Sequence, residues 1–125
     1  MDKTKTEVPI RMMYKGVGVD DRTKDYIDKK LDRITKLLER ISEIEVEIDL
    51  DKKGKFRVEI MVKTPYSLYR AEETTESIEG STDTALDEIY QQIVREKDKI
   101  KDLRERGGRS LKKKMVIDEN ARFRN

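Results

Sequence analysis

The chain has 125 residues, of which 34% are apolar and 45% are charged, and its net charge is only +2. A chain of this length fits one domain, and so few apolar residues predict a thin core with one covered sheet face. The absence of cysteine excludes disulfides and thiolate metal sites, and the absence of histidine removes the commonest general base and transition-metal ligand. We therefore expect no enzyme activity, no metal site, no cofactor and no small-molecule substrate.

No targeting segment is recognisable in the sequence. Residues 1–7 contain no apolar run, so we interpret them as an N-terminal extension and not as a secretory signal. No stretch approaches the roughly 18 consecutive apolar residues that a membrane helix requires. The sequence predicts a soluble, cytoplasmic protein without a membrane partner.

The first expected elements are a strand and a helix. Residues Val8 to Lys15 alternate in polarity, and Pro9 near the start favours a position at the sheet edge. Asp20 is a candidate N-cap for a helix over residues 20–41. The apolar positions of this helix recur at spacings of four and three, at Ile27, Leu31, Ile34, Leu38 and Ile41.

Three further strands are expected in the middle of the chain. Residues 44–51 alternate strictly between apolar and acidic side chains, and residues 51–54 have the composition of a hairpin turn. Residues 56–62 alternate again and end near Pro65, and residues 68–75 form a weaker third run. We expect residues 76–80 to be a loop.

A second helix follows, and then a basic tail. Ser81 or Thr82 is the expected N-cap, and the helix should end near Gly107 and Gly108, where glycine can adopt the left-handed conformation. The fold class is therefore α+β with the order β-α-β-β-β-α, a four-stranded sheet with two helices packed on one face. The other face should be solvated and acidic. Residues 107–125 are expected to be a flexible tail.

The charges on the first helix are sorted into separate stripes. Because each helical residue turns by about 100°, one basic stripe lies between about 180° and 240° from Ile27. Its members are Arg22, Lys29, Arg33, Lys36 and Arg40, with Tyr26 beside them and Lys30 just beyond. The stripe would extend about 27 Å and could contact several phosphates. Alternatively, pairs such as Asp25–Lys29 only stabilise the helix.

The second helix also carries an outward basic line. Arg95, Lys99 and Arg106 share one side, although basic residues near a helix C-terminus also suit the helix dipole. Residues 42–80 sum to −4, whereas residues 95–125 sum to +6. Two neighbouring basic lines favour one shared surface for a polyanion, recognised by shape and phosphate contacts.

Two segments resemble a known family. Residues 19–34 and the Thr84-Ala85-Leu86-Asp87 opening of the second helix, together with the element order, resemble the ribosome hibernation-promoting factors. This bacterial and plastid family includes the ribosome-associated inhibitor, and its members were once called sigma-factor modulation proteins. The resemblance covers about residues 8–106, which would form a ribosome-binding domain of the short form.

The resemblance implies a function and a partner. The protein would bind rRNA of the small ribosomal subunit between head and body and overlap the mRNA path and the tRNA A and P sites. It would thereby inhibit translation under stress or in stationary phase, and we expect it to be monomeric when free. From the stripes and the resemblance together, the expected RNA-binding residues are Lys15, Arg22, Lys24, Tyr26, Lys29, Lys30, Arg33, Lys36, Arg40, Arg95, Lys99 and Arg106.

Some features depart from the family or allow other interpretations. Gln92 stands where the family usually has lysine, and Lys97 where it usually has leucine. The tail is either a solvated linker or a further RNA contact through Lys112, Lys113 and Lys114. Two rival functions are a free-standing double-stranded-RNA-binding domain and a protein-interaction module. The latter would use the acidic residues Glu45, Glu47, Asp49 and Glu59.

Overall fold

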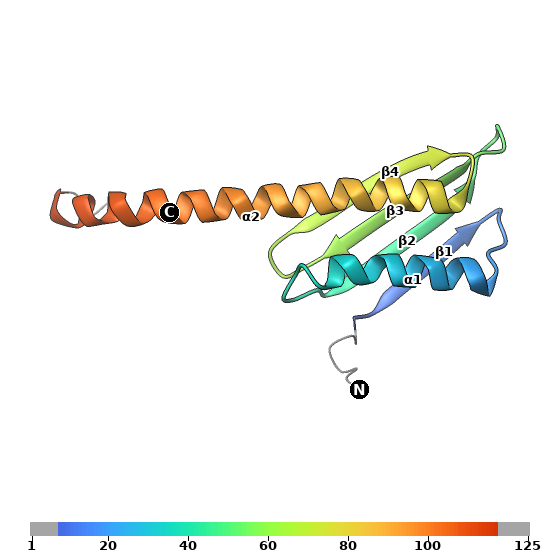
Figure 1. Ribbon diagram of the computed structural model, residues 1–125, viewed down its shortest axis with the longest axis horizontal. Helices are drawn as coiled ribbons and strands as arrows, with labels where there is room; N and C mark the ends of the chain where they lie inside the picture. The colour runs from blue at the N-terminus through green and yellow to red at the C-terminus, as the bar shows by residue number, and fades with distance from the viewer. Residues whose placement is uncertain (1–7, 118–125) are drawn as a thin grey trace. The chain divides into compact units, whose positions relative to one another are not determined.

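The computed structural model describes residues 8–117, with side chains described as far as residue 106. The elements in chain order are β1 (Ile10–Lys15), α1 (Asp21–Thr35), β2 (Glu43–Leu50), β3 (Phe56–Lys63), β4 (Leu68–Thr75) and α2 (Ile78–Ile117). This arrangement, shown in Figure 1, confirms the α+β class and the order β-α-β-β-β-α. The chain divides within α2 into two units, residues 1–92 and 93–125.

The four strands form one mixed sheet in the order β1-β2-β3-β4. β1 runs parallel to β2, with α1 as the crossover, whereas β3 and β4 are joined to their neighbours as antiparallel hairpins. The predicted edge position of β1 is confirmed. The predicted hairpin after β2 is also confirmed, because Gly54 takes a φ of 81° there and donates to the carbonyl of Asp51.

One face of the sheet is covered, as its alternation predicts. In Figure 1, α1 and the first part of α2 lie on the same side of the sheet. The wholly buried apolar side chains of α1 and of the two central strands are Ile27, Leu31, Ile34, Ile44, Val46, Ile48, Val58, Ile60 and Val62. Burial of each such side chain contributes about 1.5–3 kcal/mol. The covered face therefore supplies most of the stability of a protein with so few apolar residues.

The first helix is shorter than its apolar periodicity predicts. It ends at Thr35, and Lys36 is the C-cap, with its backbone N–H donating to the carbonyl of Asp32. The expected helical positions Leu38 and Ile41 lie in the segment between α1 and β2, where both are half-buried. The chain has to turn there because the N–H of Ser42 bonds to the carbonyl of Lys63, at 2.7 Å. Apolar spacing alone cannot distinguish a last helical turn from a covering loop.

The second helix begins earlier and ends later than expected. It starts at Ile78, where the Ser77 hydroxyl accepts a hydrogen bond from the N–H of Gly80 at 2.9 Å. Ser81, an expected cap, is instead buried inside the helix, where its hydroxyl accepts from the N–H of Thr75 and donates to the carbonyl of Phe56. Thr82 is likewise buried within the helix.

At its other end, α2 continues through residues 107 and 108 to Ile117. Glycine inside a helix costs only about 1 kcal/mol relative to alanine, so two glycines without a following proline do not force a helix to stop. The expected end near residue 107 is therefore wrong. Residues 118–125 of the expected tail lie outside the described part of the chain.

Candidate nucleic-acid interface

The buried stripe of α1 fixes the direction of its basic residues. Asp20 begins the helix by accepting a hydrogen bond from the N–H of Thr23 at 2.9 Å, which lowers the pKa of the Asp20 carboxyl. With Ile27 and Leu31 packed on the sheet, Arg22 and Lys29 are held in solvent on the outer side. Neither side chain makes an ion pair with any described residue. These two cations are available to a phosphate.

Three other predicted residues of α1 lie over aromatic rings. The ammonium of Lys24 is 5.6 Å from the ring centre of Tyr14, and that of Lys30 is 5.4 Å from the ring centre of Tyr26. The guanidinium of Arg33 is 4.5 Å from the ring centre of Tyr90 on α2. Such contacts attract a cation to the ring face without removing it from solvent. They limit how far these long side chains move.

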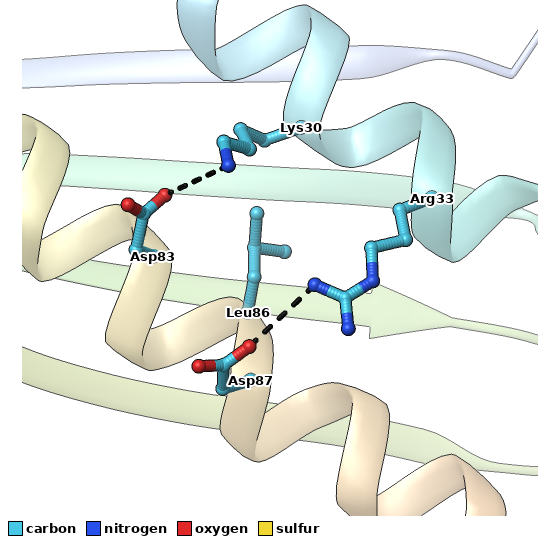
Figure 2. A pocket seen from close by; sticks show the side chains of 5 residues that line it. All are labelled: Lys30, Arg33, Asp83, Leu86 and Asp87. Carbon is cyan, nitrogen blue, oxygen red and sulfur yellow. Dashed lines mark ion pairs between the residues drawn. The ribbon is translucent and has the colours of Figure 1, made fainter.

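Two of these cations also face carboxylates on α2. Lys30 Nζ lies 3.6 Å from Asp83 Oδ1, and the Arg33 guanidinium lies 3.5 Å from Asp87 Oδ1. Figure 2 shows both pairs, with Leu86 between them. Together these five residues line a pocket of about 150 Å³ between the two helices.

Tyr26 completes this cluster. Its hydroxyl donates to the Asp83 carboxylate, 2.9 Å from both oxygens, and burial together with this carboxylate raises the pKa of Tyr26. Asp83 and Asp87 are site residues that the sequence reasoning missed. Their spacing of one helical turn was the available signal, but it does not show that α1 lies alongside.

The last two cations of the predicted basic stripe lie beyond the end of α1. Lys36 caps α1, and Arg40 follows in the segment before β2; both are exposed and make no ion pair with a described residue. The helical part of the basic stripe therefore runs only from Arg22 to Arg33, about 17 Å, and not the expected 27 Å. The positions of Lys36 and Arg40 are therefore set by the segment between α1 and β2 and not by the helical repeat.

Lys15 is separated from the helix cations. It ends β1 with its side chain on the open face of the sheet, where its ammonium lies 2.6 Å from a Glu47 carboxylate oxygen. This contact raises the pKa of Lys15 and, because the hydrogen bond favours the ionised carboxylate, lowers that of Glu47. The helices cover the opposite face, so the structure does not bring Lys15 together with the cations of α1.

The open face of the sheet is not simply acidic, and this expectation was wrong. Its carboxylates are interleaved with cations from β1, β3 and β4 in a connected set of ion pairs. Arg57 alone contacts Asp49, Glu59 and Glu72 at 2.9, 2.8 and 2.7 Å. The other pairs on this face are Arg11–Glu43, Arg11–Glu45, Lys63–Glu43, Lys63–Glu45, Arg70–Glu59 and Arg70–Glu72. These ion pairs, most of them between neighbouring strands, compensate most of the acidic charge.

Comparison with known proteins now adds to this geometry. Residues 10–101 match the family described as sigma 54 modulation protein / S30EA ribosomal protein. The match includes every strand and the start of α2. The chain belongs to this S30EA family.

Solved structures agree with that assignment. The N-terminal domain of Protein Y from Thermus thermophilus is 29% identical, with a TM-score of 0.63 over 70% of this chain and 98% of that one. A ribosomal subunit interface protein from Coxiella burnetii is 23% identical, with a TM-score of 0.65 over 73% of this chain and 99% of that one. The latter likeness bears on the fold.

In this S30EA family member, Gln92 has a structural contact of its own. Its amide side chain accepts from the N–H of Arg70 at 3.3 Å and donates to the carbonyl of Arg70 at 2.8 Å. These two hydrogen bonds connect α2 to the edge strand β4. They engage both backbone groups of Arg70, as a neighbouring strand residue would. The chain thus uses an uncharged side chain at position 92 to hold α2 on the sheet.

The second unit carries its own exposed cations. Arg95 and Lys99 are exposed and make no ion pair with a described residue, whereas Arg106 pairs with Asp102 at 2.6 Å, one turn before it. That these side chains join the α1 cations on one surface remains a prediction. The side chains of Lys112, Lys113 and Lys114 lie outside the described part of the structure.

Neither a metal site nor a membrane-spanning helix is found among the described residues. No group of three or more acidic side chains there is arranged to hold a metal ion. Among the helices of residues 8–117, none has a long enough apolar stretch to cross a bilayer.

Proposed function

We propose that this protein is a ribosome hibernation factor. It binds rRNA of the small subunit between head and body and occludes the mRNA path and the tRNA A and P sites. It thereby inhibits translation under stress or in stationary phase, in the cytoplasm and without catalysis. Family membership supports this proposal, and so does the likeness to Protein Y and to a protein named for the ribosomal subunit interface.

The observation that carries the proposal is the set of unpaired cations along α1. The exposed cations of α1 and of the segment after it that pair with no described carboxylate are Arg22, Lys29, Lys36 and Arg40. Each phosphate that such a side chain neutralises releases condensed counterions, so several contacts together give strong, salt-dependent affinity. These four cations can therefore neutralise several phosphates of one RNA.

The remaining predicted contacts extend this site. Lys24, Lys30 and Arg33 are steered by aromatic rings, and Tyr26 lies among them. We include Arg95, Lys99 and Arg106 of α2, and Lys15 as a weaker contact at a separate position, because its ammonium already pairs with Glu47. Inhibition on this account is steric: a folded domain occupies the space that mRNA and tRNA need.

The test is a matched pair of charge reversals. Arg33→Glu with Lys36→Glu reverses two cations at the end of α1, and it should lower affinity for small subunits by at least a hundredfold and abolish inhibition of in-vitro translation. Each reversal removes one phosphate contact and adds a repulsion, and counterion release multiplies these losses. Lys52→Glu with Lys53→Glu, at the exposed hairpin after β2, makes the same net-charge change and should leave both activities nearly unchanged.

Sedimentation with purified subunits over a salt series measures the effect. If the α1 variant still cosediments and inhibits as the wild type does, or if the hairpin variant fails equally, the proposed site is wrong. The rival double-stranded-RNA function predicts similar affinity for any long duplex and for subunits. Electrophoretic shifts with both RNAs separate these two outcomes.

A further inference from the structure

Two similar three-residue clusters lie one helical turn apart in the groove between α1 and the first part of α2. Each contains a cation from α1, a carboxylate from α2 and an aromatic ring. The first is Lys30, Asp83 and Tyr26, and the second is Arg33, Asp87 and Tyr90. Figure 2 shows the two ion pairs of these clusters, in which the carboxylates face the same cations that the proposed function assigns to RNA.

The geometry of both ion pairs is loose. Their N···O distances of 3.6 and 3.5 Å exceed the 2.7–2.9 Å that is typical of a charge-assisted hydrogen bond. All four charged side chains are well exposed, from 42% for Lys30 to 63% for Asp87. Exposed pairs of this kind contribute little to folding stability. The carboxylates therefore affect mainly what else the two cations can bind.

The carboxylates and the cations of the groove are positioned by different contacts. Asp83 is held by the Tyr26 hydroxyl at both oxygens, and both aspartates project from the first part of α2. The cations, in contrast, are steered by ring faces, which leave their N–H groups free to change partner. A phosphate can thus replace a carboxylate as the partner of Lys30 or Arg33 while the ring contact persists.

We propose that Asp83 and Asp87 are specificity-determining residues that compete with RNA phosphate for Lys30 and Arg33. This inference rests on the proposed function and deepens it. A generic RNA has to displace the carboxylates with one or two phosphates, whereas a surface matched to the whole of α1 also engages Arg22 and Lys29. The two aspartates therefore lower affinity for unmatched RNA more than affinity for the proper rRNA site.

The test uses isosteric variants and generic RNA. Asp83→Asn and Asp87→Asn keep the side-chain shape, and the amide that replaces the Asp83 carboxylate can still bond to Tyr26. Each substitution should raise affinity for random-sequence single-stranded RNA about two- to fivefold, and the double variant should approach the product. The salt dependence of binding should steepen by about 0.7 for each cation released. The ratio of subunit affinity to random-RNA affinity should fall.

The matched control is Asp25→Asn with Asp32→Asn, which makes the same change in net charge at exposed positions of α1 that form no described ion pair. If this control raises random-RNA affinity as much as the groove double variant does, the inference is overturned and only net charge matters. Weaker RNA binding by the groove variant would overturn it too, since the aspartates would then be orienting the cations. Binding of the wild type to small subunits tests the proposed function separately, whereas the random-RNA comparison tests only whether the two aspartates compete for Lys30 and Arg33.

Discussion

The two faces of the unit formed by residues 1–92 use charge in different ways. On the open sheet face, the cations pair closely with carboxylates, and Arg57 contacts one on its own strand and two on the neighbouring strands at 2.7–2.9 Å. On the helix face, the cations are either unpaired among the described residues or separated from a carboxylate by at least 3.5 Å. Ion pairs connect the strands on the open sheet face, whereas the cations on the helix face remain available to bind an anion.

The difference follows from the spacing of side chains in strands and helices. The Cβ atoms of directly opposed residues in an antiparallel pair lie about 5 Å apart, so side chains of opposite charge at these positions can form ion pairs. On a single exposed helix, acids and bases in separate stripes point in different directions and stay apart. A protein with 45% charged residues can therefore be internally compensated over one face and open to a polyanion on the other.

Among the tests of this difference between the two faces, the largest expected effect is on the free energy of unfolding. Arg57→Met keeps the aliphatic stem but leaves Asp49, Glu59 and Glu72 facing one another without their shared cation. We expect the free energy of unfolding to fall by about 2 kcal/mol, less than for a fully buried pair because these groups are partly exposed. For a domain of this size, thermal unfolding should shift down by roughly 10 °C.

The control for that measurement is Lys52→Met in the exposed hairpin, which should change the free energy of unfolding by less than about 0.5 kcal/mol. Affinity of the folded Arg57 variant for small subunits should stay near the wild-type value. A large loss of affinity with little loss of stability would contradict the division between the two faces.

A medium effect is expected when one cation is removed from each face. Lys29→Ala removes an exposed cation of α1 that pairs with no described carboxylate, and affinity for small subunits should fall about three- to fivefold with a shallower salt dependence. Lys15→Ala removes a cation that Glu47 already occupies, so affinity should fall less than twofold. Titrations at several salt concentrations measure both. Equal losses would show that the pairing with Glu47 does not weaken the contribution of Lys15 to binding, and would contradict the division between the two faces.

The smallest expected effect concerns acid stability. The hydrogen bond from Arg57 lowers the pKa of Glu72 below its ordinary value of 4.5. Because the folded state holds the ionised form, this stabilisation is fully present above pH 4.5 and is lost as the pH falls through the folded-state pKa. With the side chain 43% exposed, we expect Glu72→Gln to cost only a few tenths of a kcal/mol at neutral pH.

Denaturant unfolding between pH 7 and pH 3 compares this variant with the wild type. The difference in the free energy of unfolding should shrink towards zero at the acidic end. A difference that stays constant over this range would mean that the Arg57–Glu72 pair is not its source.

The fold was largely predictable from alternation and helical spacing, but the ends of the helices were not. Residues 44–50 and 56–62 alternate so regularly that their strand structure and inner face follow directly. The end of α1 was misplaced because Leu38 and Ile41 continue the apolar spacing into a covering loop. Ser81 was mistaken for a cap because a buried serine that bonds to β3 and β4 looks the same in sequence.

The candidate site was predicted in part. The unpaired cations Arg22 and Lys29 follow from the buried stripe on their own helix, because a helix fixes the direction of each side chain relative to its apolar face. Asp83 and Asp87 could not be found in this way, since their role depends on a second helix lying alongside. The sequence pattern of one helix does not show how close a second helix lies to it.

By itself, the sequence determined the strands, the covered face, the element order and the absence of any thiol or imidazole chemistry. These features are local or compositional, so residue type and spacing are enough to define them. Only the tertiary structure decided which charges are compensated. Ion pairing depends on distances of 3–4 Å between residues far apart in the chain, and the packing of α1 beside α2 and of β2 beside β3 sets those distances.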